Sequence, residues 1–249
     1  MAALSVVSTL DAVANHGTIV AMHRISTGAI VMLALLAALH PAFAGAAHDP
    51  ASVCALAHMA GEPQIPGLRI VYLAPLGDPV AANRWRNIIA HQTEGAPGSA
   101  KSLALAQAAN PTKRGVMIWV ETDGTIYWAT SETAIPTHGD GANRNDNKYI
   151  DNGPTYHAVV KTNSIGVEFN GNFPDVAAPP TQAQQDAWLI LVRFLQERYA
   201  ISSDHIYAHN WIDFKDARYC EGCALATLAR KLAYVPGHEC VSATPETMR

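Results

Sequence analysis

The sequence predicts a mixed α/β domain over about residues 66–235. Three observations indicate this class. Short runs rich in β-branched and aromatic residues are bounded by turn formers, as β-strands are. The Asp123-Gly124 pair joins two such runs, which is typical of a hairpin. Residues 181–200 carry apolar side chains at helical spacing behind a polar residue that can cap a helix.

The predicted strands are short and lie between turn-forming segments. The hairpin is expected within residues 114–130, where Asp123-Gly124 is the dipeptide preferred when both turn residues need φ > 0. Other apolar runs of the same kind predict strands at residues 68–76, 87–93, 164–171 and 205–209. Two of these runs, "NIIAHQT" and "HIYAHNW", pass from apolar residues directly into a histidine.

The best-supported helix covers residues 181–200. Thr181 can cap it, and Gln184 stands at the reciprocal position of a capping box. Apolar residues at helical spacing predict one buried stripe, which consists of Trp188, Leu191, Val192 and Leu195. Two further helices are expected at residues 98–109 and 224–234.

The N-terminal residues predict a leader. From Met22, which we take as the true start, a short basic segment is followed by an apolar core at about residues 27–39 and small residues up to Ala44. This pattern is typical of a secretory signal peptide, and the core is shorter than the roughly 20 residues of a membrane span. We therefore expect a leader at 1–44, a linker at 45–65 and a C-terminal tail at 236–249.

Composition limits the remaining possibilities. The chain has 249 residues, of which 49% are hydrophobic and 15% charged, and this suffices for one well-buried domain. The formal net charge of -4 gives no basic surface, so we expect no nucleic-acid partner. Export would place the four cysteines in an oxidising compartment, where two disulfides are the default.

The two histidines at strand ends suggest a metal site. His91 and His209, with the later thiol of Cys220, could form a three-ligand zinc site that leaves a fourth position for water. Spacing alone does not decide this, because a histidine at a strand end can equally be structural and satisfied by a carbonyl group or by water.

Several segments match one family in the right order. "IIAHQT", "DGTIYW", "HGDG", "NSIGVEFNGN", the helix at 181–200 and "HIYAHNWIDFKDARYCEG" resemble successive blocks of the zinc-dependent N-acetylmuramoyl-L-alanine amidases. This family includes phage lysozyme-type amidases and peptidoglycan recognition proteins. The resemblance covers about residues 66–232. It implies a central mixed β-sheet flanked by α-helices, with zinc in a surface groove.

The resemblance also implies the zinc ligands. The first two fall on His91 and His209, and the third falls on Cys220, while Asp213 and Asp216 remain alternatives. If Cys220 binds zinc, at most one disulfide can form among the other cysteines. We then prefer the pair Cys223–Cys240, because both residues flank the last helix.

Catalysis of amide hydrolysis needs a group that moves a proton. Glu168 stands between apolar neighbours in a predicted strand, so on alternation alone it could simply face solvent. Some relatives use a tyrosine on the strand before the Asp-Gly turn, whereas others use the glutamate. Here the position of that tyrosine is Val116, so the resemblance implies Glu168 as general base and later general acid.

Two further residues are expected at the groove. Arg218 occupies the position of a lysine in the family, and its permanent charge could stabilise the oxyanion, although an ordinary surface arginine is an equal alternative. His138 matches a histidine beside the groove and is expected to bind substrate.

Together these features predict an exported zinc hydrolase. It would cleave the amide between N-acetylmuramic acid and L-alanine in peptidoglycan or muropeptides, in the periplasm or outside the cell, with no stable membrane span in the mature chain. The alternative is a non-catalytic peptidoglycan-binding module with the same groove, which gains support if Cys220 forms a disulfide. A disulfide-stapled secreted protein with incidental histidines is a further alternative.

Overall fold

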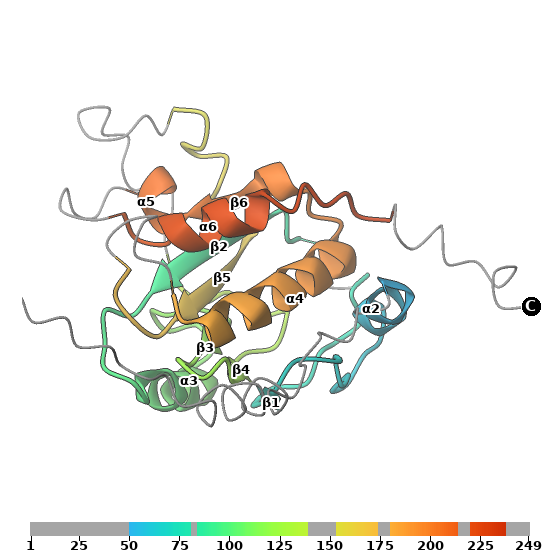
Figure 1. Ribbon diagram of the computed structural model, residues 1–249, viewed down its shortest axis with the longest axis horizontal. Coiled ribbons are helices and arrows are strands. Elements are labelled where there is room, and N and C mark those ends of the chain that lie inside the picture. The colour runs from blue at the N-terminus through green and yellow to red at the C-terminus, as the bar shows by residue number, and fades with distance from the viewer. Residues whose placement is uncertain (1–49, 81–83, 139–152, 174–179, 214–219, 238–249) are drawn as a thin grey trace, which may run out of the picture. The chain divides into compact units, whose positions relative to one another are not determined.

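A computed structural model describes residues 50–80, 84–138, 153–173, 180–213 and 220–237. Within these ranges, six strands form one sheet in the order β1-β4-β3-β5-β2-β6 (Figure 1). All neighbouring strands run parallel except β3 and β4, so the sheet is mixed. The strands are β1 (Ile70–Tyr72), β2 (Asn87–Gln92), β3 (Ile118–Val120), β4 (Ile126–Trp128), β5 (Ser164–Phe169) and β6 (Ile206–Ala208).

Helices flank this sheet, which confirms the predicted fold class. They are α2 (Pro50–Ala57), α3 (Ser99–Ala109), α4 (Gln182–Tyr199), α5 (His209–Ile212) and α6 (Cys223–Arg230), with a 3₁₀ turn η1 at Ser203–His205. None of the described helices combines the length and the apolar character that a membrane crossing needs.

Helix α4 is the element that the sequence predicts best. Thr181 Oγ1 accepts a hydrogen bond from the backbone N–H of Gln184 at 3.2 Å, and the Gln184 side chain accepts one from the backbone of Thr181. The expected capping box is therefore present. The predicted stripe packs into the main core without exposure, and it consists of Trp188, Leu191, Val192 and Leu195.

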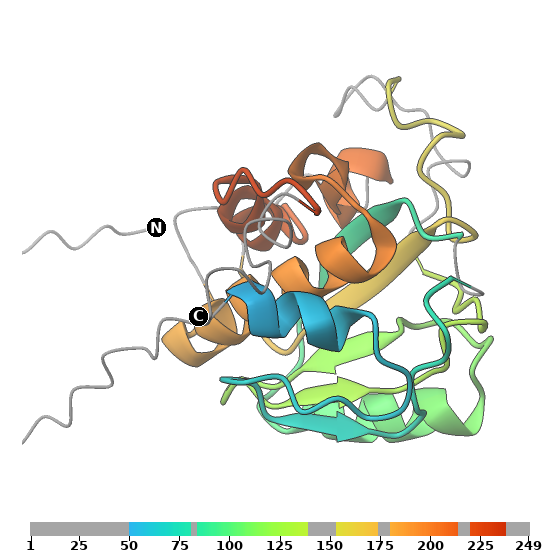
Figure 2. The ribbon, with the colours of Figure 1, turned by 90° about the vertical axis from the view of Figure 1, so that its right-hand side faces the viewer.

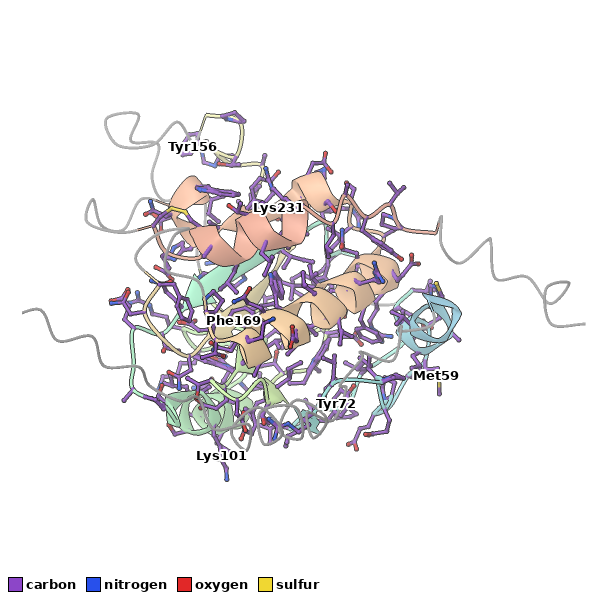
Figure 3. The ribbon with its side chains drawn as sticks, viewed as in Figure 1. Met59, Tyr72, Lys101, Tyr156, Phe169 and Lys231 are labelled. Atoms are coloured by element: carbon purple, nitrogen blue, oxygen red, sulfur yellow. A yellow bond between two sulfur atoms is a disulfide. The ribbon has the colours of Figure 1, made fainter. Side chains whose placement is uncertain are left out.

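The strands divide their side chains between two faces. In β5, Ile165, Val167 and Phe169 (labelled in Figure 3) belong to the core cluster that includes α4. The centroids of the Phe169 and Trp188 rings lie 5.3 Å apart. Ser164, Gly166 and Glu168 alternate with them and therefore point to the opposite face.

Helix α3 covers only part of that opposite face. It packs through Ala100 and Ala104 against Trp119 of β3, so α3 and α4 lie on opposite sides of β3 and β4 (Figure 2). Farther along the sheet, Ile212 of α5 packs against Ile89 of β2. The carboxyl end of β5 lies between these two covered regions, which is where a groove can form.

The hairpin of β3 and β4 is confirmed, but its turn differs in detail from the expectation. Gly124 adopts φ 79°, whereas Asp123 is not among the described residues with positive φ. The N–H of Gly124 donates to the carbonyl of Glu121 at 2.9 Å. The loop between the strands is longer than two residues. A type I turn followed by one glycine in the left-handed region therefore closes it.

The segment expected as a linker at 45–65 contains helix α2. Val53 and Ala57 of this helix are buried in the main core, and Arg198 of α4 donates to the carbonyl oxygens of Ala57 and Met59 at 2.6 and 2.8 Å. An alanine-rich composition therefore marks a packed helix here. The expected leader at 1–44 and residues 238–249 of the expected tail lie outside the described residues.

Candidate metal site and groove

Strand β2, which lies between β5 and β6, places His91 near its carboxyl end. Every residue of β2 is buried, because β5 and β6 pair with it on its two sides. In the parallel register His91 is the partner of Glu168, so the two side chains share one face. The carboxyl ends of parallel strands meet at one edge of a sheet, which is where ligand sites of such folds form.

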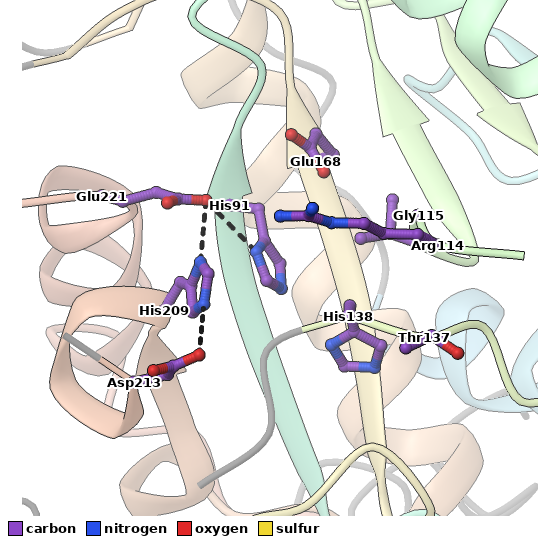
Figure 4. A pocket seen from close by; sticks show the side chains of 10 residues that line it. His91, Arg114, Gly115, Thr137, His138, Glu168, His209, Asp213 and Glu221 are labelled. Carbon is purple, nitrogen blue, oxygen red and sulfur yellow. Dashed lines mark hydrogen bonds and ion pairs between the residues drawn. The ribbon is translucent and has the colours of Figure 1, made fainter. Parts of the chain in front are cut away.

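His209 arrives at the same edge from β6. The strand ends at Ala208, and His209 is the first residue of α5. Its ring centroid lies 4.6 Å from that of His91 (Figure 4). One turn later, Asp213 Oδ2 lies 3.7 Å from His209 Nε2.

Glu221 completes the cluster. Its Oε1 lies 3.3 Å from His91 Nδ1 and 2.9 Å from His209 Nδ1. One donor atom from each of these residues lies within 4.8 Å of the others, so the three side chains could hold a metal ion. Glu221 is only 3% exposed, and a buried carboxylate needs a cation or hydrogen bonds to offset its lost hydration.

A glycine permits this close approach. Gly222 begins α6 with φ 82°, and a Cβ there would lie 2.0 Å from the carbonyl oxygen of Ala90 in β2. The carbonyl of Glu221 also accepts a hydrogen bond from the N–H of Asn210 at 3.2 Å. The turn is thus held against both histidine-bearing segments, and this directs the Glu221 side chain between them.

The structure corrects the expectation for Cys220. Its sulfur is bonded to that of Cys223, and a disulfide sulfur has no thiolate to offer a metal. The preferred pair Cys223–Cys240 is therefore wrong, and Cys54 is also in a disulfide. The third residue of the cluster is Glu221 and not the expected Cys220, because the turn at Gly222 points the Glu221 side chain at the histidines.

The electrostatics of the cluster favour a bound positive charge. Burial alone would raise the pKa of Glu221, but hydrogen bonds from His209 and His91 hold that pKa well below its usual range. Burial alone would lower the pKa of His209, but its contacts with Asp213 and Glu221 outweigh burial and raise the pKa to about 9. A metal cation could satisfy the same carboxylates in place of the proton.

The donor set fits zinc. Two imidazoles and one glutamate form one of the ligand sets found in catalytic zinc sites. Asp213, which was an alternative third ligand, instead contacts Nε2 of His209, the ring nitrogen that faces away from Glu221. A carboxylate in that place orients a ligating histidine. Asp216 lies outside the described residues.

The cluster opens into a hollow of about 260 Å³. Glu168 lines it and is half-buried, as a group that must meet both substrate and water would be. Arg114, from the segment before β3, lines the opposite side from α5 (Figure 4). Sequence reasoning missed Arg114 and Glu221, and it placed the positive charge on Arg218, which lies outside the described residues.

His138 also lines the groove, as expected. Its ring lies 5.4 Å from that of His91, edge to face, and its Nε2 lies 3.1 Å from the carbonyl oxygen of Ser164. Gly166 makes room for it, because a Cβ there would lie 3.2 Å from His138 Cγ. Burial, with repulsion from His91, lowers the pKa of His138 to about 3, so the ring is neutral.

The tautomer of His138 follows from these contacts. A neutral imidazole carries one N–H, and the carbonyl of Ser164 can only accept, so Nε2 is the donor. The other nitrogen, Nδ1, makes no hydrogen bond within the described part of the chain. It therefore presents a lone pair that can accept a hydrogen bond.

The sequence of the chain matches a family of amide hydrolases. The family described as N-acetylmuramoyl-L-alanine amidase (Amidase_2) matches residues 81–223, more than half of the chain. The chain belongs to this family. The match includes His91, His138, Glu168, His209 and Glu221. A search of curated proteins finds no match.

Solved structures of the same class are similar to the chain at low sequence identity. The amidase LysC from Clostridium intestinale URNW is 17% identical, with 66% of this chain and 97% of that chain covered and a TM-score of 0.45. A mutant endolysin from Bacillus subtilis is 20% identical, with 59% and 88% covered and a TM-score of 0.40. PGRP-Hd from Alvinella pompejana is 18% identical, with 57% and 79% covered and a TM-score of 0.35.

Proposed function

We propose that this chain is an exported zinc hydrolase that cleaves the amide between N-acetylmuramic acid and L-alanine in peptidoglycan or muropeptides. The observation that carries the proposal is the meeting of His91, His209 and Glu221 at a groove that also contains Glu168. Membership of the amidase family supports amide hydrolysis as the chemistry. The donor set of two imidazoles and one carboxylate supports zinc as the metal.

Each residue then has a distinct task. His91, His209 and Glu221 would hold the ion, and a bound zinc ion would supply a Lewis acid that polarises the scissile carbonyl and lowers the pKa of water. Glu168 moves the proton: as a carboxylate it accepts one from the attacking water, and as an acid it gives one to the departing amide nitrogen.

Two neighbouring residues have positioning roles, His138 toward the substrate and Asp213 toward the metal-binding imidazole of His209. His138 offers the Nδ1 lone pair to an N–H group of the bound substrate, since its own N–H is engaged by Ser164. Asp213 holds the imidazole of His209 from the far ring nitrogen. These residues act on orientation, so their loss should weaken the reaction less than loss of Glu168.

Metal content and peptide release test the proposal together. The purified protein should carry one zinc per chain and release the L-alanyl peptide from a soluble N-acetylmuramoyl peptide. His91→Ala should lose both properties. His58→Ala, which removes an exposed histidine outside the groove, should lose neither. Peptide release by a zinc-free protein at the same rate would refute the assignment.

Export is the part of the proposal that concerns location. It is supported by the leader-like residues 22–44 and by the Cys220–Cys223 disulfide, because disulfides persist in oxidising compartments. We place the mature protein in the periplasm or outside the cell. N-terminal sequencing of the mature chain should begin at Gly45, and a cytoplasmic protein that starts at residue 1 or 22 would contradict this.

A non-catalytic peptidoglycan-binding module is the second candidate. The disulfide at Cys220 favours it, because the expected thiolate ligand is lost. Glu221 favours the enzyme, because it supplies a carboxylate to the same two histidines. A binding module would retain peptidoglycan in a pull-down and release no peptide even with zinc bound, so the assay above separates the two candidates.

A further inference from the structure

Arg114 is the one residue with a permanent positive charge among the described residues that line the groove. The carboxylates there are those of Glu168, Asp213 and Glu221. The Arg114 side chain is exposed, and no ion pair joins it to another described residue. Figure 4 shows it reaching over β5 toward His91 and Glu168.

The backbone that carries Arg114 rests on a buried glutamine. Gln107 of α3 is 3% exposed. Its side-chain amide donates to the carbonyl oxygens of Asn110, Pro111 and Lys113 at 3.4, 3.1 and 3.2 Å. One side chain thereby fixes the loop from the end of α3 to the residue before Arg114.

The residue after Arg114 is fixed as well. The N–H of Gly115 donates to the carbonyl of Thr137 at 3.1 Å, and the N–H of Thr137 donates to that of Lys113 at 3.2 Å. Gly115 has φ 147°, and a Cβ there would lie 1.9 Å from Gln107 Oε1. Only glycine lets the supporting glutamine and the loop approach this closely, so the arginine extends from a rigid base.

We propose that Arg114 is a specificity-determining residue that binds a carboxylate on the peptide side of the scissile amide. This inference rests on the proposed amide hydrolysis. The carboxyl group of N-acetylmuramic acid forms the scissile amide and carries no charge. A carboxylate that pairs with Arg114 must therefore come from the peptide. A guanidinium pairs with a carboxylate through two parallel hydrogen bonds, and a fixed backbone lowers the entropy lost when it does so.

Two soluble substrates of matched shape test the proposal. One is N-acetylmuramoyl-L-alanyl-glutamate, and the other is its diamide, in which both free carboxyl groups are amides. The protein should favour the acid by roughly tenfold in kcat/KM, mainly through KM, because a charge-assisted hydrogen bond is worth about one such factor. Arg114→Gln should abolish this preference, and Arg114→Lys should keep part of it.

Two further variants control for general effects. Lys101→Gln removes an equal charge from an exposed position of α3 outside the groove (Figure 3), and it should leave the preference intact. Gln107→Leu removes the support of the loop while Arg114 stays in the chain. It should reduce the preference for the acid without loss of zinc. If Gln107 only stabilised the fold, its loss would affect both substrates equally.

The outcomes separate this inference from the proposed function. Equal turnover of both substrates by the unmodified protein, or an unchanged preference in Arg114→Gln, refutes the inference alone. An equal fall of kcat on both substrates in Arg114→Gln also refutes it, because the arginine would then act on the oxyanion. If neither substrate is hydrolysed, the proposed function fails. The inference is then tested by calorimetry, in which the protein should bind the acid about tenfold more tightly than the diamide.

Discussion

Gly222→Ala should remove the metal while it leaves the fold intact. A Cβ at this position would lie 2.0 Å from the carbonyl oxygen of Ala90, and real Cβ contacts essentially never fall below 3.0 Å. The turn must therefore retreat from β2 by about 1 Å. Metal–ligand distances tolerate only about 0.2 Å, so Glu221 would leave the reach of a metal held by the histidines.

Gly98→Ala is the matched control. Gly98 and Gly222 both precede helices, with φ 90°, ψ -8° and φ 82°, ψ -4° respectively, so both variants bear the same left-handed cost of about 1–2 kcal/mol. Nothing lies within 4 Å of a Cβ at Gly98. Both variants should lose thermal stability from the left-handed strain, Gly222→Ala more because of its added clash, but only Gly222→Ala should lose zinc in a chelator competition. Equal zinc affinity of the two variants would refute the reasoning.

Three other variants test separate parts of the structure. Glu168→Ala should keep its zinc but lose turnover by about 10²–10⁴, as expected for a lost general base; full turnover would show that another group moves the proton. Cys220→Ser should keep zinc, because the carboxylate of Glu221 is the ligand, and zinc loss in elemental analysis would return Cys220 to the site. Arg198→Met should lower the free energy of unfolding in urea by about 3–5 kcal/mol, because Glu132, 1% exposed, loses its buried partner; a change below about 1 kcal/mol would contradict this.

The fold was predictable where local signals and burial agree. The capping box at Thr181 and Gln184 and the hairpin around Gly124 depend on neighbours in sequence, and the structure confirms both. The helix at Pro50–Ala57 was not predictable, because its burial depends on α4, a distant partner. A short alanine-rich helix has little intrinsic stability and forms mainly through such packing.

The site was predictable only in part, for a geometric reason. His91 lies near the end of one short apolar strand and His209 follows another, and parallel pairing brings the ends of these strands together. The third group depends on how one turn faces the sheet, and sequence alone cannot separate Cys220 from Glu221 at adjacent positions. Arg114 carried no sequence signal, because its role depends on a loop held by Gln107.

The cluster joins parts of the chain that lie far apart in the sequence. His91 and Glu221 are 130 residues apart, and β2 must pair with β6 before the two histidines face each other. Contacts of such long range form slowly, because closing large loops costs chain entropy before any contact repays it. An unfolded chain thus offers no assembled cluster, so the affinity for the ion depends on the folded sheet. Conditions that open the pairing of β2 with β6 should therefore release the metal.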